Sequence, residues 1–283
     1  MKTVDRVREM KQAVAELKSR GLSIGFVPTM GCLHEGHLSL VRESLKKAAR
    51  TVVSVFVNPT QFGPSEDFMK YPRDLKRDAE ILDRMGVDYL FAPEPEEIYP
   101  EGYKTYVEVH ELQDRLCGRS RPGHFRGVCT VVLKLFHIVN PDVSFFGQKD
   151  AQQAIILKRM VKDLDMDVTI EVMPIVRDKD GIALSSRNTY LSPEERKAAL
   201  CLSRSLKAAR TMIKKGERDA GKIIQKMREI FEREPLARID YVEIVDVEEL
   251  RPIPQIKKEA LIALAVFIGS TRLIDNDIIR IKE

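Results

Sequence analysis

Hydrophobic positions along the first 175 residues alternate between a helical period and short, continuously apolar runs. At 4–19 and 75–85 the apolar residues recur every three or four positions, and Gly86 ends the second stripe. The run TVVSVFVN at 51–58 is apolar on both faces, as in a strand buried within a parallel sheet. In chain order we expect a helix at 4–19, a strand at 24–27, a helix at 38–48, a strand at 51–58, a helix at 75–85, a strand at 88–93, a helix at 126–139, a strand from 143, a helix at 154–164 and a strand at 168–174.

This alternation predicts an α/β fold, a Rossmann-like doubly wound parallel sheet with right-handed crossovers. Near residue 176 the pattern changes. The segment SPEER at 192–196 is typical of a capping box, with Ser192 as N-cap and Glu195 reaching back, and it opens a long helix. A helix at 219–232 and strands at 239–246, 260–268 and 277–281 complete the pattern. We therefore expect a first domain over 1–175 and a smaller C-terminal α+β domain over 176–283.

Composition narrows the class of protein. Hydrophobic residues make up 43% and charged residues 32% of the chain, which is typical of a soluble globular protein. The 47 basic and 43 acidic residues are interleaved, and their net charge of +4 is too mild to favour nucleic acid as a partner. No apolar run reaches the roughly 20 residues that cross a bilayer. The N-terminus is charged throughout, unlike a targeting peptide, so we expect a cytoplasmic protein without membrane contact.

Four scattered cysteines, Cys32, Cys117, Cys129 and Cys201, include no Cys-x-x-Cys pair. In a reducing compartment such a set is typical of isolated thiols, and it favours neither a disulfide framework nor a zinc site.

Two of the five histidines lie in the turn His34-Glu35-Gly36-His37, directly after the first predicted strand. Ligands of doubly wound sheets bind at the carboxyl ends of the strands. Glycine there lets backbone N–H groups approach an anion, the helix that follows adds its positive dipole, and two imidazoles can stabilise charge on a breaking phosphoanhydride. The turn thus favours a triphosphate, but taken alone it also fits a pair of metal ligands or an ordinary helix start.

Two further segments point to the same crevice. FGQKD at 146–150 ends the fourth predicted strand, which in the order 3-2-1-4-5 adjoins the first, so Lys149 should face His37. IALSSRNTYLS at 182–192 carries two hydroxyls and Arg187, a set suited to wrapping phosphates. Its alternative interpretation is a polar linker before the capped helix.

Together these segments resemble the pantoate:beta-alanine ligase family of the HIGH-motif nucleotidyltransferase superfamily. The resemblance covers nearly the whole chain and rests on PTMGCLHEGH, VFVNPTQFGPSEDFMKYPRD, RPGHFRGVCTVVLKLFHIVNPDVSFFGQKDAQQ and DGIALSSRNTYLS. Two small departures are Cys32, where the family has a small or aromatic residue, and Leu184, where methionine is frequent.

The resemblance implies a reaction in two steps. Pantoate and ATP form pantoyl adenylate and pyrophosphate, and the amine of beta-alanine then displaces AMP to give pantothenate. It also implies a homodimer, and a C-terminal domain that closes over the ATP site. Mg²⁺ is expected on the ATP phosphates, with protein ligands that the sequence does not identify.

The site residues implied by the resemblance fall into three sets. The catalytic set is His34, His37 and Lys149. The ATP-binding set is Met30, Gly31, Cys32, Leu33, His34, Glu35, Gly36, His37, Gly147, Gln148, Lys149, Asp150, Val176, Leu184, Ser185, Ser186 and Arg187. Gln61 and Gln153 are the expected ligands of pantoate and beta-alanine. A neutral amide suits this role, because it can hydrogen-bond a carboxylate without an ion pair that would blunt its attack.

Interpretations without a role in catalysis or binding remain open for several of these residues. Gln61 also fits a turn after Asn58-Pro59, and Gln153 a solvated position on a helix. The loop with Arg115, Arg119, Arg121, His124 and Arg126 is a candidate lid over a hydrolysable anhydride, or else a solvated basic loop.

Two rival functions also remain. An adenylyltransferase that leaves AMP on its product would not need Gln61, Gln153 and the 100-residue C-terminal region. A nucleotide-sensing or RNA-binding module would call for an aromatic and basic stripe, which the sequence lacks.

Overall fold

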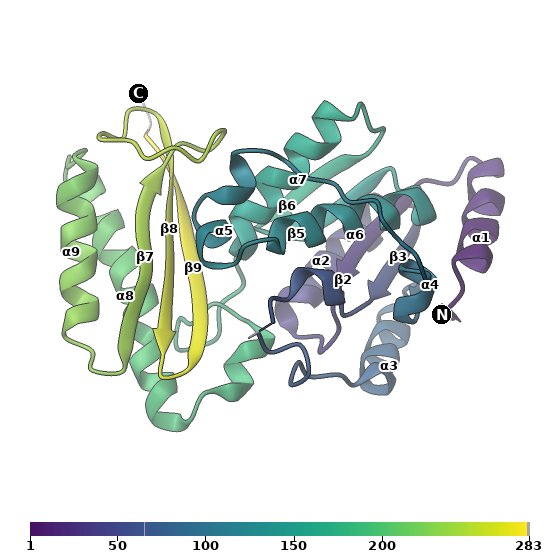
Figure 1. The fold of residues 1–283 in the computed structure, drawn as a ribbon, viewed down its shortest axis with the longest axis horizontal. Coiled ribbons are helices and arrows are strands. Elements are labelled where there is room, and N and C mark those ends of the chain that lie inside the picture. Colours follow the sequence, from purple (N-terminus) through teal and green to yellow (C-terminus); the bar gives the residue numbers. More distant parts are fainter. Residues whose placement is uncertain (65, 282–283) are drawn as a thin grey trace.

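Two sheets lie side by side in the computed structural model, which describes residues 1–64 and 66–281 (Figure 1). The larger sheet is entirely parallel and has six strands in the order β1-β4-β3-β2-β5-β6. Its strands are β1 (Lys2–Val4), β2 (Ile24–Thr29), β3 (Arg50–Val55), β4 (Tyr89–Phe91), β5 (Val143–Gly147) and β6 (Thr169–Met173). The smaller sheet is antiparallel, in the order β7-β8-β9, with β7 (Ala237–Val245), β8 (Glu259–Ile268) and β9 (Thr271–Arg280).

Helices cover both faces of the six-stranded sheet. Helices α2 (Glu35–Lys47) and α3 (Leu75–Met85) pack on one face, and α1 (Val7–Ser19), α6 (His124–Val139) and α7 (Ala151–Asp163) on the other. Neighbouring residues of one strand join different cores: Phe26 packs with α1 and α6, whereas Val27 packs with α2 and α3. This burial of both faces explains the continuously apolar strands, and the predicted doubly wound fold is confirmed.

The first predicted strand, β2, pairs with β3 on one side and with β5 on the other. The order 3-2-1-4-5 expected for the five predicted strands is therefore correct. It places the carboxyl ends of β2 and β5 next to each other, where the direction of winding reverses.

Several sequence-based boundaries were wrong: α7 begins at Ala151 instead of 154, and β3 ends at Val55 instead of 58. Residues Lys2–Val4 form an edge strand, with Val4 opposite Phe91, and the first helix begins only at Val7. Helix α2 begins at Glu35 instead of 38 and so includes most of the histidine turn, and α6 begins at 124 instead of 126. Strand β9 begins at Thr271 instead of 277, because its polar residues are buried by specific partners.

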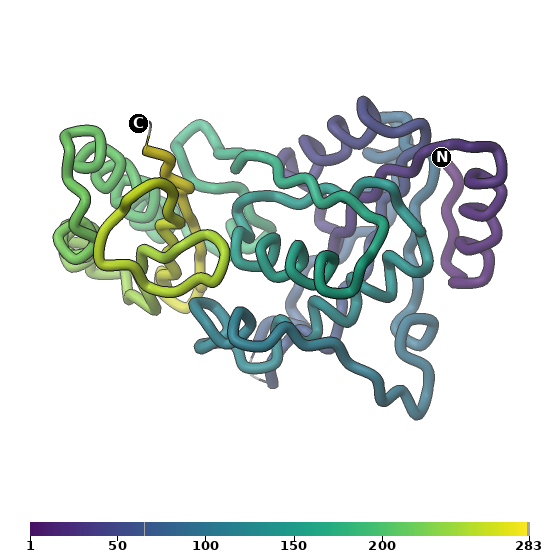
Figure 2. The backbone as a smooth tube through the Cα atoms, turned by 90° about the horizontal axis from the view of Figure 1, so that it is seen from above, coloured from purple at the N-terminus to yellow at the C-terminus, as the bar shows by residue number. Residues whose placement is uncertain are grey.

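Both faces of the smaller sheet are buried as well. One face, with Val242 and Leu264, packs against α8 (Pro193–Lys214) and α9 (Ala220–Glu232). The other, with Tyr241 and Ala263, joins the core of the six-stranded unit. Figure 1 accordingly shows this sheet between the pair α8 and α9 and the rest of the molecule, and Figure 2 shows the two units along the long axis.

Short elements complete the chain: η1 (Pro59–Gln61), α4 (Pro95–Ile98), η2 (Leu112–Asp114), α5 (Cys117–Ser120), η3 (Gln148–Asp150) and η4 (Ser186–Tyr190). No helix within residues 1–64 and 66–281 is both long and apolar enough to span a bilayer.

Replacing Ser192 by alanine should destabilise the protein. Ser192 Oγ accepts a hydrogen bond from the Glu195 N–H (3.2 Å), and the Ser192 N–H donates to Glu195 Oε2 (2.8 Å), so the predicted capping box is confirmed. We expect Ser192→Ala to lower the free energy of unfolding by about 1 kcal/mol in urea titrations. Ser203→Ala, the same change inside α8, should cost clearly less, and equal losses would contradict a capping role.

Candidate active site

Backbone amides of the turn after β2 are held by a buried carboxylate. Gly31 and Cys32 have left-handed φ values of 80° and 50°. The fully buried Asp78 of α3 accepts hydrogen bonds from the amides of Cys32 (2.7 Å) and Leu33 (2.9 Å). The amides of Cys32 and Leu33 thus already have an acceptor within the chain.

Gly36 makes room for the two imidazoles. A Cβ atom added there would lie 2.9 Å from ring atoms of His34, so a larger residue would displace this ring from its place over the first turn of α2. The rings of His34 and His37 then lie with their centroids 4.0 Å apart. The His34 N–H donates to His37 Nδ1 (3.3 Å), so a neutral His37 carries its proton on Nε2.

Lys149 lies close enough to both rings to affect their titration. Burial, followed by the charge of Lys149, lowers the pKa of His34 to about 4. Burial, then His34, then Lys149 lower the pKa of His37 to about 3. Both imidazoles are therefore neutral near pH 7. The two strand ends thus bring the imidazole pair and the lysine together, as the sequence predicted, and Lys149 Nζ lies 3.6 Å from Asp150 Oδ2.

A cavity of about 190 Å³ opens beside the histidine turn. Its polar lining includes His37, Gln61, Asp150, Gln153 and Arg187, while side chains of α6 such as Val131 and Leu135 form an apolar wall. A smaller cavity of about 80 Å³ shares Asp150, Gln153 and Arg187 and adds Lys149 and Ser185. The structure therefore brings both predicted glutamines to the same space as the histidine and lysine motifs.

Three residues without an assigned role in the sequence hold Gln61 in place. Its side-chain oxygen accepts a hydrogen bond from Asn58 Nδ2 (3.1 Å), which also donates to the carbonyl of Gly127 on α6 (3.1 Å). Tyr99 donates its hydroxyl to Asn58 Oδ1 (2.9 Å). A Cβ at Gly127 would lie 2.4 Å from the carbonyl oxygen of Thr60, so glycine lets η1 rest directly on α6. In the sequence, the Asn58-Pro59 turn at a strand end was the feature that could have pointed to this support of Gln61.

The loop with Leu184 to Arg187 lies against the histidine turn. A Cβ at Gly36 would be 3.8 Å from Leu184 Cβ, and the Leu184 N–H donates to the carbonyl of Val176 (3.0 Å). Ser186 Oγ lies 3.0 Å from the hydroxyl of Tyr71.

Arg187, which lines both cavities, makes a bidentate ion pair with Asp67 at 2.9 and 2.8 Å. No local pattern in the sequence relates Asp67 to Arg187, 120 positions further along the chain.

Several predicted site residues line neither cavity, namely Gly31, Cys32, Leu33, His34, Glu35, Gly36, Gln148, Val176, Leu184 and Ser186. The side chain of Leu33 is buried in the core beside α2 and α3. Glu35 is exposed and pairs with Arg42 of the same helix.

The predicted lid segment at 115–126 makes contacts on two sides. Arg121 forms a bidentate pair with Glu66 (2.7 and 2.6 Å), and His124 Nδ1 is hydrogen-bonded to the carbonyl of Gln61 (2.8 Å). Ser120 donates to Asp240 at the start of the smaller sheet (2.7 Å). A closing motion, which stays a prediction, would have to break or carry along these contacts.

Comparison with known proteins identifies the family. The family model described as pantoate-beta-alanine ligase matches residues 2–278. The chain belongs to the pantoate-beta-alanine ligase family. It is similar to the pantothenate synthetase of Pelotomaculum thermopropionicum, with 58% identity over 99% of both chains, and to that of Thermosipho africanus, with 57% identity over 99% of this chain and 100% of the relative. As a member of this family, it is a ligase of pantothenate biosynthesis.

Solved structures of the family agree with this fold. The pantothenate synthetase of Thermus thermophilus is 46% identical, with a TM-score of 0.94 over 98% of this chain and 99% of that chain. The pantoate-beta-alanine ligase of Francisella tularensis, solved in complex with beta-gamma ATP and beta-alanine, is 34% identical, with a TM-score of 0.80 over 98% and 97%. The resemblance that the motifs indicated is thereby confirmed.

Acidification should destabilise the protein through its histidine pair. Because the folded-state pKa of His37 lies well below the usual 6.5, the unfolded chain binds more protons between about pH 6.5 and pH 3. Stability should therefore fall as the pH falls through this window, by less than about 1.4 kcal/mol per pH unit for a ring that is partly exposed. Urea titrations near pH 7 and pH 5 should show a smaller loss for His37→Gln than for the parent.

The matched control is His137→Gln, which changes an exposed histidine of α6. It should lose as much stability on acidification as the parent does. The same pH dependence in all three proteins would contradict a neutral, partly buried His37.

Proposed function

We propose that the two cavities take ATP and pantoate, and that the site activates pantoate as an adenylate before joining it to beta-alanine. One observation carries this proposal: His37, Gln61, Gln153 and Arg187 come from four separate segments and line a single cavity. Two neutral amides opposite an imidazole suit a substrate that must present a free carboxylate as nucleophile.

In the first step a carboxylate oxygen of pantoate bonds to the α-phosphorus of ATP, and the bond from that phosphorus to pyrophosphate breaks. Lys149 supplies positive charge to the phosphate oxygens, and the neutral His37 donates a hydrogen bond from Nε2. These groups stabilise the charge that develops on the leaving pyrophosphate. The bound polyphosphate is itself anionic, so it would raise the pKa of both imidazoles.

Positioning supplies much of the rate. Holding the carboxylate in line with the α-phosphorus can lower the barrier by about 7 to 11 kcal/mol in the best intramolecular models. We assign Gln61 and Gln153 to the polar groups of pantoate, and the α6 wall with Val131 and Leu135 to its two methyl groups. The remaining predicted residues, from Met30 to His37, Gly147 to Asp150, Val176 and Leu184 to Arg187, would surround the nucleotide.

In the second step the amine nitrogen of beta-alanine bonds to the carbonyl carbon of the adenylate. The bond from that carbon to the oxygen of AMP breaks, and the nitrogen releases a proton. The relative from Francisella tularensis, whose complex contains beta-alanine together with an ATP species, supports these two molecules as substrates.

Mg²⁺ would enter on the phosphates of ATP. Of the acidic residues that line the smaller cavity, Asp150 lies beside Lys149, and Asp275 is paired with Arg177. Phosphate oxygens and water would thus provide most of the ligands, which is usual for Mg²⁺ at nucleotide sites. When bound, the ion would neutralise charge on the polyphosphate.

Three further expectations stay proposals. We propose a boundary between two domains at 175/176, a cytoplasmic location and a homodimer. Sedimentation of the purified protein would test the homodimer directly.

Product analysis tests the proposed reaction. With ATP, Mg²⁺ and pantoate the protein should release pyrophosphate and retain the adenylate, and AMP should appear only after beta-alanine is added. Chromatography of the nucleotides with and without each substrate makes the measurement. Release of AMP without pantoate, or an AMP group retained on the final product, would contradict the ligase mechanism.

Gly127→Ala tests the support beneath Gln61. The added methyl group would lie 2.4 Å from the carbonyl oxygen of Thr60, so η1 must move away from α6 and take Gln61 with it. A displacement of about 1 Å can cost on the order of a hundredfold in rate. We expect the KM for pantoate to rise at least about tenfold, and the KM for ATP to change much less.

Gly221→Ala adds the same methyl group to α9, far along the chain from the predicted site residues, and should leave both KM values near those of the parent. An unchanged KM for pantoate in a folded Gly127→Ala protein would contradict the proposed role of Gln61.

A further inference from the structure

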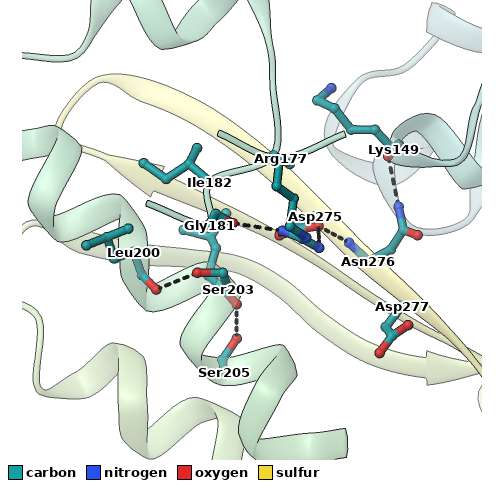
Figure 3. A network of polar contacts seen from close by, with 12 residues as sticks. Lys149, Arg177, Gly181, Ile182, Leu200, Ser203, Ser205, Asp275, Asn276 and Asp277 are labelled. Carbon is teal, nitrogen blue, oxygen red and sulfur yellow. Dashed lines mark hydrogen bonds and ion pairs between the residues drawn. The ribbon is translucent and has the colours of Figure 1, made fainter. Parts of the chain in front are cut away.

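Asn276 of β9 hydrogen-bonds the backbone of the turn that carries Lys149. Its side-chain nitrogen donates to the carbonyl of Lys149 (2.9 Å; Figure 3). The same nitrogen donates to the carbonyl of Gln148 (2.9 Å), and the side-chain oxygen accepts from Gln148 Nε2 (3.3 Å). The residue is 4% exposed. The nitrogen and the oxygen of this side-chain amide therefore both bind one turn. Its residues Gln148 and Lys149 lie 128 and 127 positions earlier in the chain.

The residue before it, Asp275, anchors the same stretch of β9. Its side chain is 2% exposed and forms a bidentate pair with Arg177 at 2.7 and 2.9 Å. Arg177 also donates to the carbonyl of Gly181 (3.1 Å), in the turn that leads to the loop with Leu184 to Arg187. Figure 3 shows Arg177, Asp275 and Asn276 between this turn and Lys149. Strand β9 thus connects two of the predicted ATP-binding segments.

The alternation of side chains along β9 sets the direction of Asn276. Leu273 and Ile279 belong to the core with α8 and α9, whereas Ile274 and Ile278 pack on the core of the six-stranded unit. Asn276 is in register with the second pair and so faces the larger unit. A buried polar residue costs stability unless it is hydrogen-bonded. If position 276 only stabilised the smaller sheet, an apolar residue would do so at least as well as asparagine.

We propose that Asn276 is a positioning residue, which fixes the backbone at Lys149 so that the ammonium group meets the phosphates of ATP. The inference rests on the proposed role of Lys149 in adenylate formation. The carbonyl of Lys149 is one of the two acceptors. The smaller sheet therefore fixes the backbone from which the Lys149 side chain extends. A shift of this backbone would move the ammonium charge away from the position at which it stabilises the leaving group.

The kinetic test compares Asn276→Asp and Asn276→Ala with the control Asp277→Asn. Asp277 lies next along β9 but faces α8, where it forms a bidentate pair with Arg210 at 2.8 and 2.6 Å. We expect the kcat of pantoate-dependent pyrophosphate release to fall at least about tenfold in both Asn276 variants, with the KM for pantoate within about twofold of the parent. Asp277→Asn should lower the unfolding midpoint and leave kcat near that of the parent.

A spectroscopic test does not depend on the reaction. Reductive ¹³C-methylation labels the lysines, and the NMR signal of Lys149 is assigned by its loss in Lys149→Arg. This signal should shift in both Asn276 variants and stay in place in Asp277→Asn. If the parent releases no pyrophosphate at all, the proposed function fails, while the signal of Lys149 still tests the positioning role.

Three results would overturn the inference. The first is an unchanged kcat, or an unmoved Lys149 signal, in folded Asn276→Asp. The second is a loss of kcat that follows the loss of stability equally in all three variants. The third is a failure of both Asn276 variants to fold while Asp277→Asn folds, since Asn276 would then serve the sheet and not the lysine.

Discussion

The pairing of β2 with β5 is the constraint on which the site depends. It places the end of one strand, with its histidine turn, beside the end of another, with its lysine turn, although more than a hundred residues separate them in the chain. The mutual effect of these groups on titration follows from this proximity, because a cation next to two partly buried imidazoles favours their neutral forms. A neutral ring with its proton on Nε2 can only donate a hydrogen bond there, which suits phosphate oxygens.

Side chains that hold the loops in place shape the site as much as the predicted substrate ligands do. Asp78 holds the turn after β2, Asn58 and Gly127 hold Gln61, and Asn276 holds the turn after β5. Each of these contacts joins a loop to a regular element on another part of the fold. The cavity is therefore assembled from loops that have little freedom of their own, which is the arrangement that in-line attack on phosphorus requires.

The sequence was sufficient to predict helices and strands with a clear hydrophobic period. It was insufficient where contacts with residues far away in the chain determine the local structure. A strand buried on both faces, such as β8, is plain in the pattern because nearly every position is apolar. The three-residue strand β1 merges with the apolar series of α1, and β9 was only half recognised because Asp275 and Asn276 do not look like strand residues. The space that Gly36 leaves for an imidazole could not be predicted, for the same reason. That His34 folds back over it, and that Asp78 takes the neighbouring amides, depends on atoms that no local pattern relates.

The hydrogen bonds from Asn276 to the turn after β5 also bear on how the chain acquires its site during synthesis. Domains tend to fold as their residues leave the ribosome, beginning from the N-terminus. The six-stranded sheet is complete by residue 173, whereas β9 emerges last. A nascent chain can therefore carry the histidine turn and the lysine long before β9 is made, so the lysine turn gains the support of Asn276 only late in synthesis.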